Sequence, residues 1–126
     1  VKPTHADEYS KYITQLANRK VKTNGQLDED RFQLIRDWAD NRGLYDEGDT
    51  KTQYCKLIEE AGELGRAILK DNHVEFVDAI GDMVVVLTNM AMLGGTSIEN
   101  CIDSAYKVIS KRTGKMVNGT FVKDEK

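Results

Sequence analysis

The chain has 126 residues, of which 40% are hydrophobic and 31% are charged, with a formal net charge of −3 at pH 7. This length fits one domain that has its own core and is small enough to gain stability from a partner subunit. The composition excludes a disordered chain, and the two cysteines lack the spacing of a disulfide framework or a zinc site. No apolar signal segment opens the chain, and the apolar run 83–93 is too short to cross a bilayer. We therefore expect a cytoplasmic protein that does not insert into a membrane.

Charge is divided unevenly along the chain. Seven acids lie between Glu59 and Asp82 against two bases, whereas residues 107–126 carry six bases against two acids. This division fits a metal-dependent site for a phosphorylated small molecule, although a solvated basic tail explains the C-terminal charge equally well. The bases are few and no aromatic platform alternates with them, so we do not expect a nucleic-acid partner.

Periodic apolar positions, a single proline and glycines placed between the periodic segments predict an all-α fold. In chain order we expect an N-terminal arm or short helix over 1–26, a helical core over 27–112 and a C-terminal tail over 113–126. Within the core the expected helices cover 28–41, 50–70, 74–93 and a last segment that starts at a Thr96 or Ser97 cap and reaches about 112, with a polar loop over 45–50. Asn118-Gly119 between apolar pairs predicts a small hairpin, the alternative being an extended tail. The expected architecture is one domain of antiparallel helical hairpins forming a four-helix bundle.

The helix expected over 74–93 carries its acids on a single stripe. Asp82 lies in an apolar run over 80–87, so we expect a buried carboxylate, which is costly unless a cation or dense hydrogen bonding compensates it. At about 100° per residue, three further polar residues share its stripe: Glu75, Asp78 and Asn89. A helix this apolar should be buried, and its polar stripe should meet something polar.

The helix expected over 50–70 carries a second acidic stripe. Glu59, Glu60 and Glu63 share one face with Lys56, a face that taken alone is usually solvated. The short turn after Lys70 makes the two helices an antiparallel hairpin, which brings the stripes within reach of each other. Mg²⁺ or Mn²⁺ would relieve the repulsion, because both bind carboxylate oxygens. Zinc is disfavoured because the cluster has no His or Cys, and a di-iron centre because it lacks the Glu-x-x-His pairs.

Three segments resemble the MazG-like all-α nucleoside triphosphate pyrophosphohydrolases, in particular the small phage-type members. They are Lys56–Leu64 (KLIEEAGEL), Asp78–Asp82 (DAIGD) and Arg112–Phe121 (RTGKMVNGTF), and the similarity spans residues 32–122. The resemblance implies Mg²⁺-dependent hydrolysis of a (deoxy)nucleoside triphosphate to the monophosphate and pyrophosphate. It also implies a homodimer or homotetramer of helical hairpins, located in the host cytoplasm if the protein is phage-encoded.

Carried over by position, the resemblance implies metal ligands at Glu60, Glu63 and Asp82. Many members have Glu three residues before that Asp, where this chain has Ala79. Either Glu75 or Asp78 must then substitute, and the choice between them stays open. Glu59, beside the ligands, is the candidate to orient or deprotonate the attacking water, so the expected catalytic residues are Glu59, Glu60 and Glu63.

Several residues are candidate substrate contacts, each with a structural alternative. Lys56 shares the acidic face, and Asn89 could bind a sugar or base or satisfy a buried neighbour. Trp38 and Phe32 could stack on a base, although their spacing is more typical of core. Phosphate contacts are expected from the bases at helical spacing near the C-terminus, where a solvated face is the alternative: Lys107, Lys111, Arg112 and Lys115.

The nucleobase does not follow from these motifs, and a deoxynucleotide is the favoured substrate because phage-type members remodel nucleotide pools. A second interpretation belongs to a different class. Ala79 in place of an acid favours a catalytically silent helical dimer that binds metal or nucleotide in a regulatory role.

Overall fold

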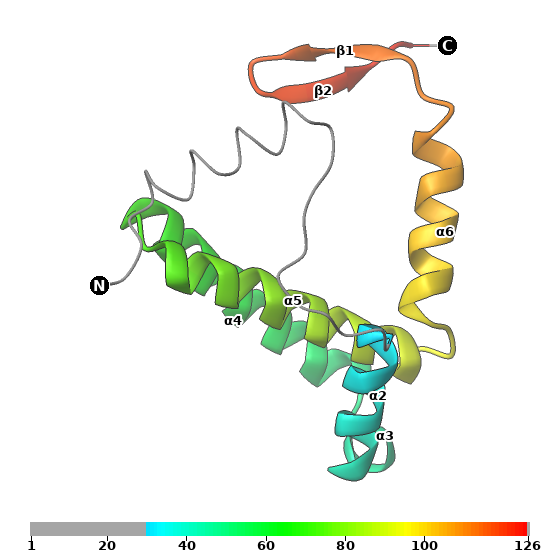
Figure 1. The fold of residues 1–126 in the computed structure, drawn as a ribbon. Helices are drawn as coiled ribbons and strands as arrows, with labels where there is room; N and C mark the ends of the chain where they lie inside the picture. The colour runs from blue at the N-terminus through cyan, green and yellow to red at the C-terminus, as the bar shows by residue number, and fades with distance from the viewer. Residues whose placement is uncertain (1–29, 126) are drawn as a thin grey trace.

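A computed structural model describes residues 30–125. Its elements in chain order are α2 (Arg31–Asn41), α3 (Leu44–Glu47), α4 (Thr50–Leu69), α5 (His73–Leu93), α6 (Ile98–Ile109), β1 (Gly114–Val117) and β2 (Thr120–Lys123). The chain is therefore mostly helical and ends in a small antiparallel hairpin, as predicted (Figure 1). The arm expected over 1–26 lies outside the described residues.

Side-chain caps explain where the long helices begin. Asp49, Asn72 and Ser97 each accept a hydrogen bond from the backbone N–H three residues on, at 2.7, 3.2 and 3.1 Å. Each cap satisfies one N–H group that the first helical turn leaves without a partner. The helices predicted over 50–70 and 74–93 are confirmed to within one residue, and Ser97 rather than Thr96 caps α6.

Helices α4 and α5 form the antiparallel hairpin that supports the rest of the fold (Figure 1). The turn between them passes through Asp71, whose φ of 51° places it in the left-handed region. Buried small residues occur on both helices, Ala67 at 1% and Ala79 at 3% exposure. Small side chains of this kind let two helices approach closely.

The described chain does not form the four-helix bundle that we expected. Helices α2 and α3 contact α5, and α6 leaves the C-terminal end of α5 and runs away from the hairpin (Figure 1). Every residue from Asn100 to Glu125 is exposed. Thus α6 contacts α5 only near its start, and its apolar positions from Ile102 onward stay exposed within the described residues.

Two smaller boundaries also differ from expectation. The polar loop predicted over 45–50 contains the single helical turn α3, which follows Gly43 at a φ of 81°. Helix α6 ends at Ile109, three residues before the expected position. Periodicity did not reveal either feature, because one helical turn is shorter than a repeat and helix ends fray.

Polar contacts join the smaller helices to the hairpin. Arg36 of α2 donates to both carboxylate oxygens of Glu99 at the start of α6, each at 2.7 Å. The hydroxyl of Tyr45 in α3 donates to the Oδ1 atom of Asn89 in α5 at 2.6 Å. Asn89 is 2% exposed, so its contact with Tyr45 is shielded, whereas the Arg36–Glu99 pair joins a buried guanidinium to a carboxylate whose side chain is 42% exposed. The bidentate geometry fixes the direction of α6 as well as its position.

The C-terminal hairpin follows the predicted turn chemistry. Strand β1 pairs with β2 from Gly114 opposite Lys123 to Val117 opposite Thr120. The two connecting residues, Asn118 at φ 50° and Gly119 at φ 84°, are both left-handed. This is the backbone of a type I′ turn, for which Asn-Gly is the preferred pair.

Length and composition alone would allow α5 to span a membrane, with a mean hydropathy of 1.6 over its most apolar window. The apolar run of 83–93 considered above is only part of this helix. The window is 22% buried in one chain, and the core helix of a soluble protein can have the same composition. Helix α5 also carries Asp78 and Asp82, which are costly inside a bilayer.

The Arg36–Glu99 contact predicts a pH dependence of stability. The hydrogen bond from Arg36 lowers the pKa of Glu99 below its ordinary 4.5. A lowered folded-state pKa contributes stability above the unfolded-state value, and this contribution is lost as the pH falls through the folded-state value. A Glu99→Gln variant should therefore melt below wild type at pH 7, and the gap should narrow toward about pH 3.

Thermal unfolding followed by circular dichroism at both pH values measures this gap. Asp103→Asn is the matched control, because Asp103 forms only an exposed pair with Lys107 at 3.0 Å on the same helix. An equal gap for Glu99→Gln at both pH values contradicts the prediction.

Candidate metal centre

Three carboxylates meet on one face of the hairpin. Glu60 and Glu63 of α4 and Asp82 of α5 each offer an oxygen, and these oxygens lie within 4.8 Å of one another. Oxygens that share one Mg²⁺ at about 2.1 Å lie within about 4.2 Å of one another. Small side-chain movements would therefore bring this set to the spacing of a shared ligand shell.

Glu60 is the buried member of this set. It is 6% exposed, and within residues 30–125 its buried Oε2 atom has no hydrogen-bond partner. Its Oε1 atom lies 3.5 Å from the Nζ atom of Lys56. Burial raises the pKa of Glu60, and the neighbouring Glu63 and Asp82 raise it further, while Lys56 lowers it.

The Oε2 atom of Glu60, buried without a hydrogen-bond partner, shows whether a cation would fit this position. A buried carboxylate that lacks part of its hydrogen bonding costs free energy, which a positive charge at that position offsets. The set contains only carboxylates, the ligand type that Mg²⁺ and Mn²⁺ prefer. The residues present therefore fit a hard divalent cation.

The expectation that Asp82 is the buried acid is wrong. Asp82 is exposed, because α5 packs on α4 along one side only and Asp82 lies at the rim of a hollow. The buried acid is Glu60, on the face that taken alone indicates solvation. One signal could have found it, since Glu60 is the acid of that face nearest to the apolar positions of its helix.

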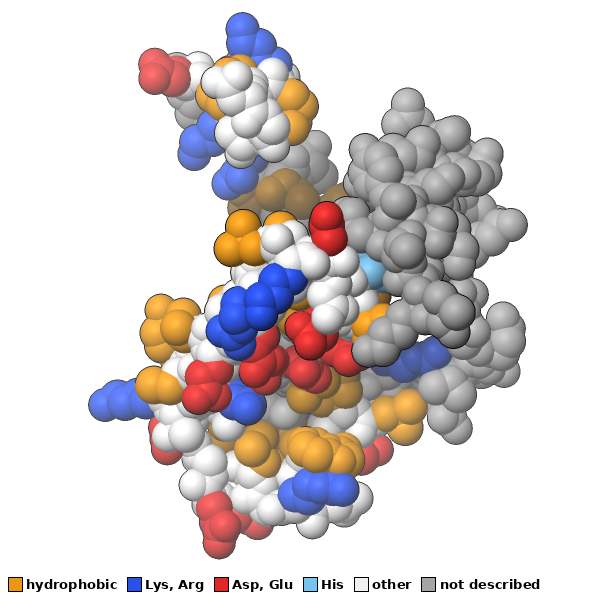
Figure 2. All heavy atoms as spheres, turned by 90° about the vertical axis from the view of Figure 1, so that its left-hand side faces the viewer, with side chains coloured by type: hydrophobic (Ala, Val, Ile, Leu, Met, Phe, Trp, Pro, Cys, Tyr) orange, Lys and Arg blue, Asp and Glu red, His pale blue; other side chains and the backbone are white. Residues whose placement is uncertain are grey.

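Glu75 and Asp78 lie near the three carboxylates without joining them. They line an open hollow of about 460 Å³ together with Glu63, Asp82, Arg66, Lys70 and Ala79. Figure 2 shows the acidic side chains gathered on this side of the molecule, with basic side chains beside them. Both alternatives for the fourth acid therefore remain, and Ala79 contributes only a methyl group to the lining of this hollow.

Glu59 and Lys56 form the edge of the site. The side chain of Glu59 is 69% exposed, and its Oε2 atom lies 3.6 Å from the Nζ atom of Lys56. The charges of Glu60 and then Glu59 raise the pKa of Lys56. Lys56 is thus a cation beside the carboxylates, whereas Glu59 lies outside the group of three and its catalytic role stays a prediction.

The aromatic and amide candidates are not brought to the carboxylates by any described contact. Asn89 is buried and accepts the hydrogen bond from Tyr45 described above, which is the structural alternative stated for it. Trp38 is 49% exposed on α2, with the Arg42 guanidinium 4.3 Å from its ring centre. Phe32 is half-buried on the same helix.

The basic candidates lie at the far end of α6, away from the hairpin in Figure 1. Lys107 pairs with Asp103. A separate hollow of about 630 Å³ is lined by four bases and two acids: Lys107, Lys111, Arg112, Lys123, Asp124 and Glu125. Lys115 lies in β1. One chain therefore separates its acidic and basic candidates.

Part of the chain is similar to a phage protein. It is 36% identical over 75 residues to the "Uncharacterized 18.2 kDa protein in rep-hol intergenic region" of Haemophilus phage HP1 (strain HP1c1). The match covers 60% of this chain and 42% of the phage protein, so the chain spans less than half of that relative. No protein-family profile and no solved structure matches. The relative's name assigns no chemistry.

The buried charge on Glu60 predicts opposite effects without and with metal. Glu60→Gln removes a desolvated charge that Glu63 and Asp82 repel, so in EDTA the variant should melt a few degrees above wild type. The added stability that Mn²⁺ gives the wild type should be largely lost, because a ligand oxygen has been replaced.

Differential scanning calorimetry in EDTA and in Mn²⁺ measures both effects. Glu59→Gln is the matched control, since it removes the exposed charge of the neighbouring residue. It should leave the melting temperatures in EDTA and in Mn²⁺ nearly unchanged. A Glu60→Gln protein that keeps the full Mn²⁺ shift would show that this carboxylate is not a ligand.

Proposed function

We propose that the protein hydrolyses a (deoxy)nucleoside triphosphate to the monophosphate and pyrophosphate with the help of Mg²⁺. The observation that carries this proposal is the group of three carboxylates that includes the uncompensated Glu60. The motif resemblance described above supports the same reaction, and the similarity to a phage protein agrees with the phage-type members of that family.

The proposed metal ligands are Glu60, Glu63 and Asp82, with either Glu75 or Asp78 as a further acid. Mg²⁺, or Mn²⁺ in its place, supplies positive charge to offset the triphosphate and the leaving pyrophosphate and lowers the pKa of a water aimed at the α-phosphorus. Glu59 is the proposed base for that water, which requires its exposed carboxylate to exchange Lys56 for the water. Lys56, which keeps its contact with Glu60, could then turn toward a phosphate oxygen.

We also propose that a second copy completes the four-helix bundle. The exposed apolar residues of α5 recur at spacings of three, four and three, the pattern of a helix-packing seam: Val77, Ile80, Val84 and Leu87. At about 100° per residue this seam lies roughly opposite the acids of α5. Two hairpins can therefore meet through their apolar faces and leave both acidic faces accessible, in a homodimer or a pair of such dimers.

The proposed cellular role is remodelling of a nucleotide pool in the host cytoplasm, with a deoxynucleotide as substrate. The phage relative supports this location. A second candidate function is a silent metal- or nucleotide-binding dimer with a regulatory role. Ala79 favours this alternative, because many members of the MazG-like family, which the chain resembles, have an acid at that position.

Substitution of Asp82 tests the catalytic proposal. Asp82→Asn should lower the rate of pyrophosphate release at least about 100-fold, because one oxygen of the metal shell loses its charge. It should also weaken Mg²⁺ binding and leave the helical circular dichroism spectrum unchanged, since Asp82 is exposed. Asp103→Asn, an exposed acid on α6, is the control and should keep wild-type activity. Full activity of Asp82→Asn would refute the assignment.

Identification of the products separates the two functions. Wild-type protein is incubated with each of the eight common NTPs and dNTPs and with Mg²⁺ or Mn²⁺. We expect monophosphate and pyrophosphate from at least one deoxynucleotide, whereas diphosphate and phosphate would indicate different chemistry. A melting temperature that rises with metal and nucleotide, without any product, would favour the silent dimer.

The same assay decides between the two open ligands. Of Glu75→Gln and Asp78→Asn, the substitution at the direct ligand should reduce activity and Mn²⁺ binding together. The other should leave Mn²⁺ binding near wild type. Equal loss of binding in both variants would mean that both acids contact metal.

A further inference from the structure

The C-terminal arm, defined here as α6 and the β1–β2 hairpin (residues 98–123), lacks cover within the described chain. Ile102, Tyr106 and Ile109 recur at helical spacing on α6 and are 50%, 63% and 52% exposed. The hairpin adds Met116 and Phe121 at 65% and 47%. A helix of 12 residues with no packed face is marginal in water, so the arm needs a partner surface.

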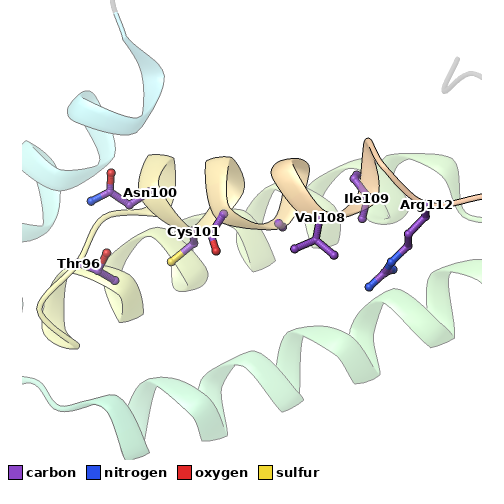
Figure 3. A pocket seen from close by; sticks show the side chains of 8 residues that line it. Thr96, Asn100, Cys101, Val108, Ile109 and Arg112 are labelled. Carbon is purple, nitrogen blue, oxygen red and sulfur yellow. The ribbon is translucent and has the colours of Figure 1, made fainter. Parts of the chain in front are cut away.

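An open hollow runs along the length of α6. It measures about 730 Å³ and is lined by residues of α6 and its flanks, among them Cys101, Ala105, Val108 and Arg112. In Figure 3 the labelled side chains of Cys101, Val108 and Arg112 point from α6 into this space. The lining is mostly apolar with a base at one end, which suits an apolar helix whose neighbouring surface is acidic.

The arm of a chain is directed away from its own hairpin. Residues 94–97 connect α5 to α6, with Gly95 at a φ of 85°, and the bidentate Arg36–Glu99 contact then holds the start of α6 against α2. The seam on α5 and the apolar stripe on α6 are thus both exposed in the same chain. A second copy can cover both at once.

The distribution of charge also favours a second copy of the chain as the partner of the arm. Residues 107–125 hold five bases and two acids, Asp124 and Glu125, which line the same hollow as four of the bases. Residues 59–82 of the hairpin hold seven acids and two bases, so the two surfaces still differ in the sign of their charge. Figure 1 shows the basic end of α6 apart from the α4–α5 hairpin of its own chain. A second copy offers the complementary surface that the arm lacks.

We infer that the C-terminal arm of each copy packs on the α4–α5 hairpin of a second copy, with its apolar stripe covered and its bases toward the partner's acids. The inference rests on the homodimer of the proposed function and requires no turnover. Because a two-fold interface is reciprocal, the two arms are exchanged. Each acidic site then receives its phosphate-binding cations from the other chain.

The test places charge inside the inferred contact. Ile102→Asp combined with Ile109→Asp should raise the dimer Kd more than about tenfold, as loss of buried apolar contacts at an interface does. Sedimentation velocity over a concentration series gives the Kd, and circular dichroism checks that the helices remain. The control is Asp103→Asn, on the polar side of α6, which should leave the Kd unchanged.

A second variant tests the charge contact without touching the apolar stripe. Lys111→Glu combined with Arg112→Glu should weaken the dimer and reduce the rise of its Kd with added NaCl, because opposite charges no longer face each other. An unchanged Kd and an unchanged salt dependence would overturn the placement of the bases toward the partner's acids.

Each other outcome also decides the inference. A wild-type protein that stays monomeric overturns the inference and would leave residues 1–29 as the cover of α6. An Ile102→Asp, Ile109→Asp double variant that remains a dimer also overturns it. A monomer that floats with phosphatidylglycerol vesicles also overturns it and assigns the stripe to a lipid surface. A dimer that releases no pyrophosphate refutes the proposed catalysis but does not contradict the inferred exchange of arms.

Discussion

The desolvated carboxylate of Glu60 is the constraint on which the site depends. Glu60 is buried on α4, and within residues 30–125 Lys56 lies near one of its two oxygens while the other has no hydrogen-bond partner. Asp82 and Glu63 raise the cost because they bring further negative charge. A divalent cation bound at the proposed site would remove the repulsion, and metal binding and stability of the hairpin would then be linked.

The hairpin has two unlike faces, and this division explains the open shape of the chain. Its acids gather on one side, and the α5 seam of Val77, Ile80, Val84 and Leu87 lies roughly opposite. Neither α2 nor α3 covers this seam, because both contact α5 near its C-terminal end, where Tyr45 meets Asn89. This exposed apolar face is the surface through which the proposed dimer would build its bundle from two chains.

Local patterns predicted the parts of the fold that local chemistry controls. The cap of α6 at Ser97, one of the two residues expected there, both hairpin helices and the Asn118-Gly119 turn follow from residues within a few positions of each other. The direction of α6 does not, since Arg36 and Glu99 are 63 residues apart and no periodicity links them. The acidic stripes correctly indicated which acids meet across α4 and α5. They predicted the wrong buried member, Asp82 instead of Glu60, because burial depends on how the two helices pack.

The separation of acids and bases along the chain has a consequence for the order of events at the site. All proposed metal ligands lie on α4 and α5 of one chain, so a monomer has everything that metal binding requires. The arm bases at 107–123 reach such a site only from a second chain if the arms are exchanged. Metal would then bind at any protein concentration, whereas a triphosphate would be held only after assembly. Activity per chain would fall on dilution below the dimer Kd while metal affinity stayed constant.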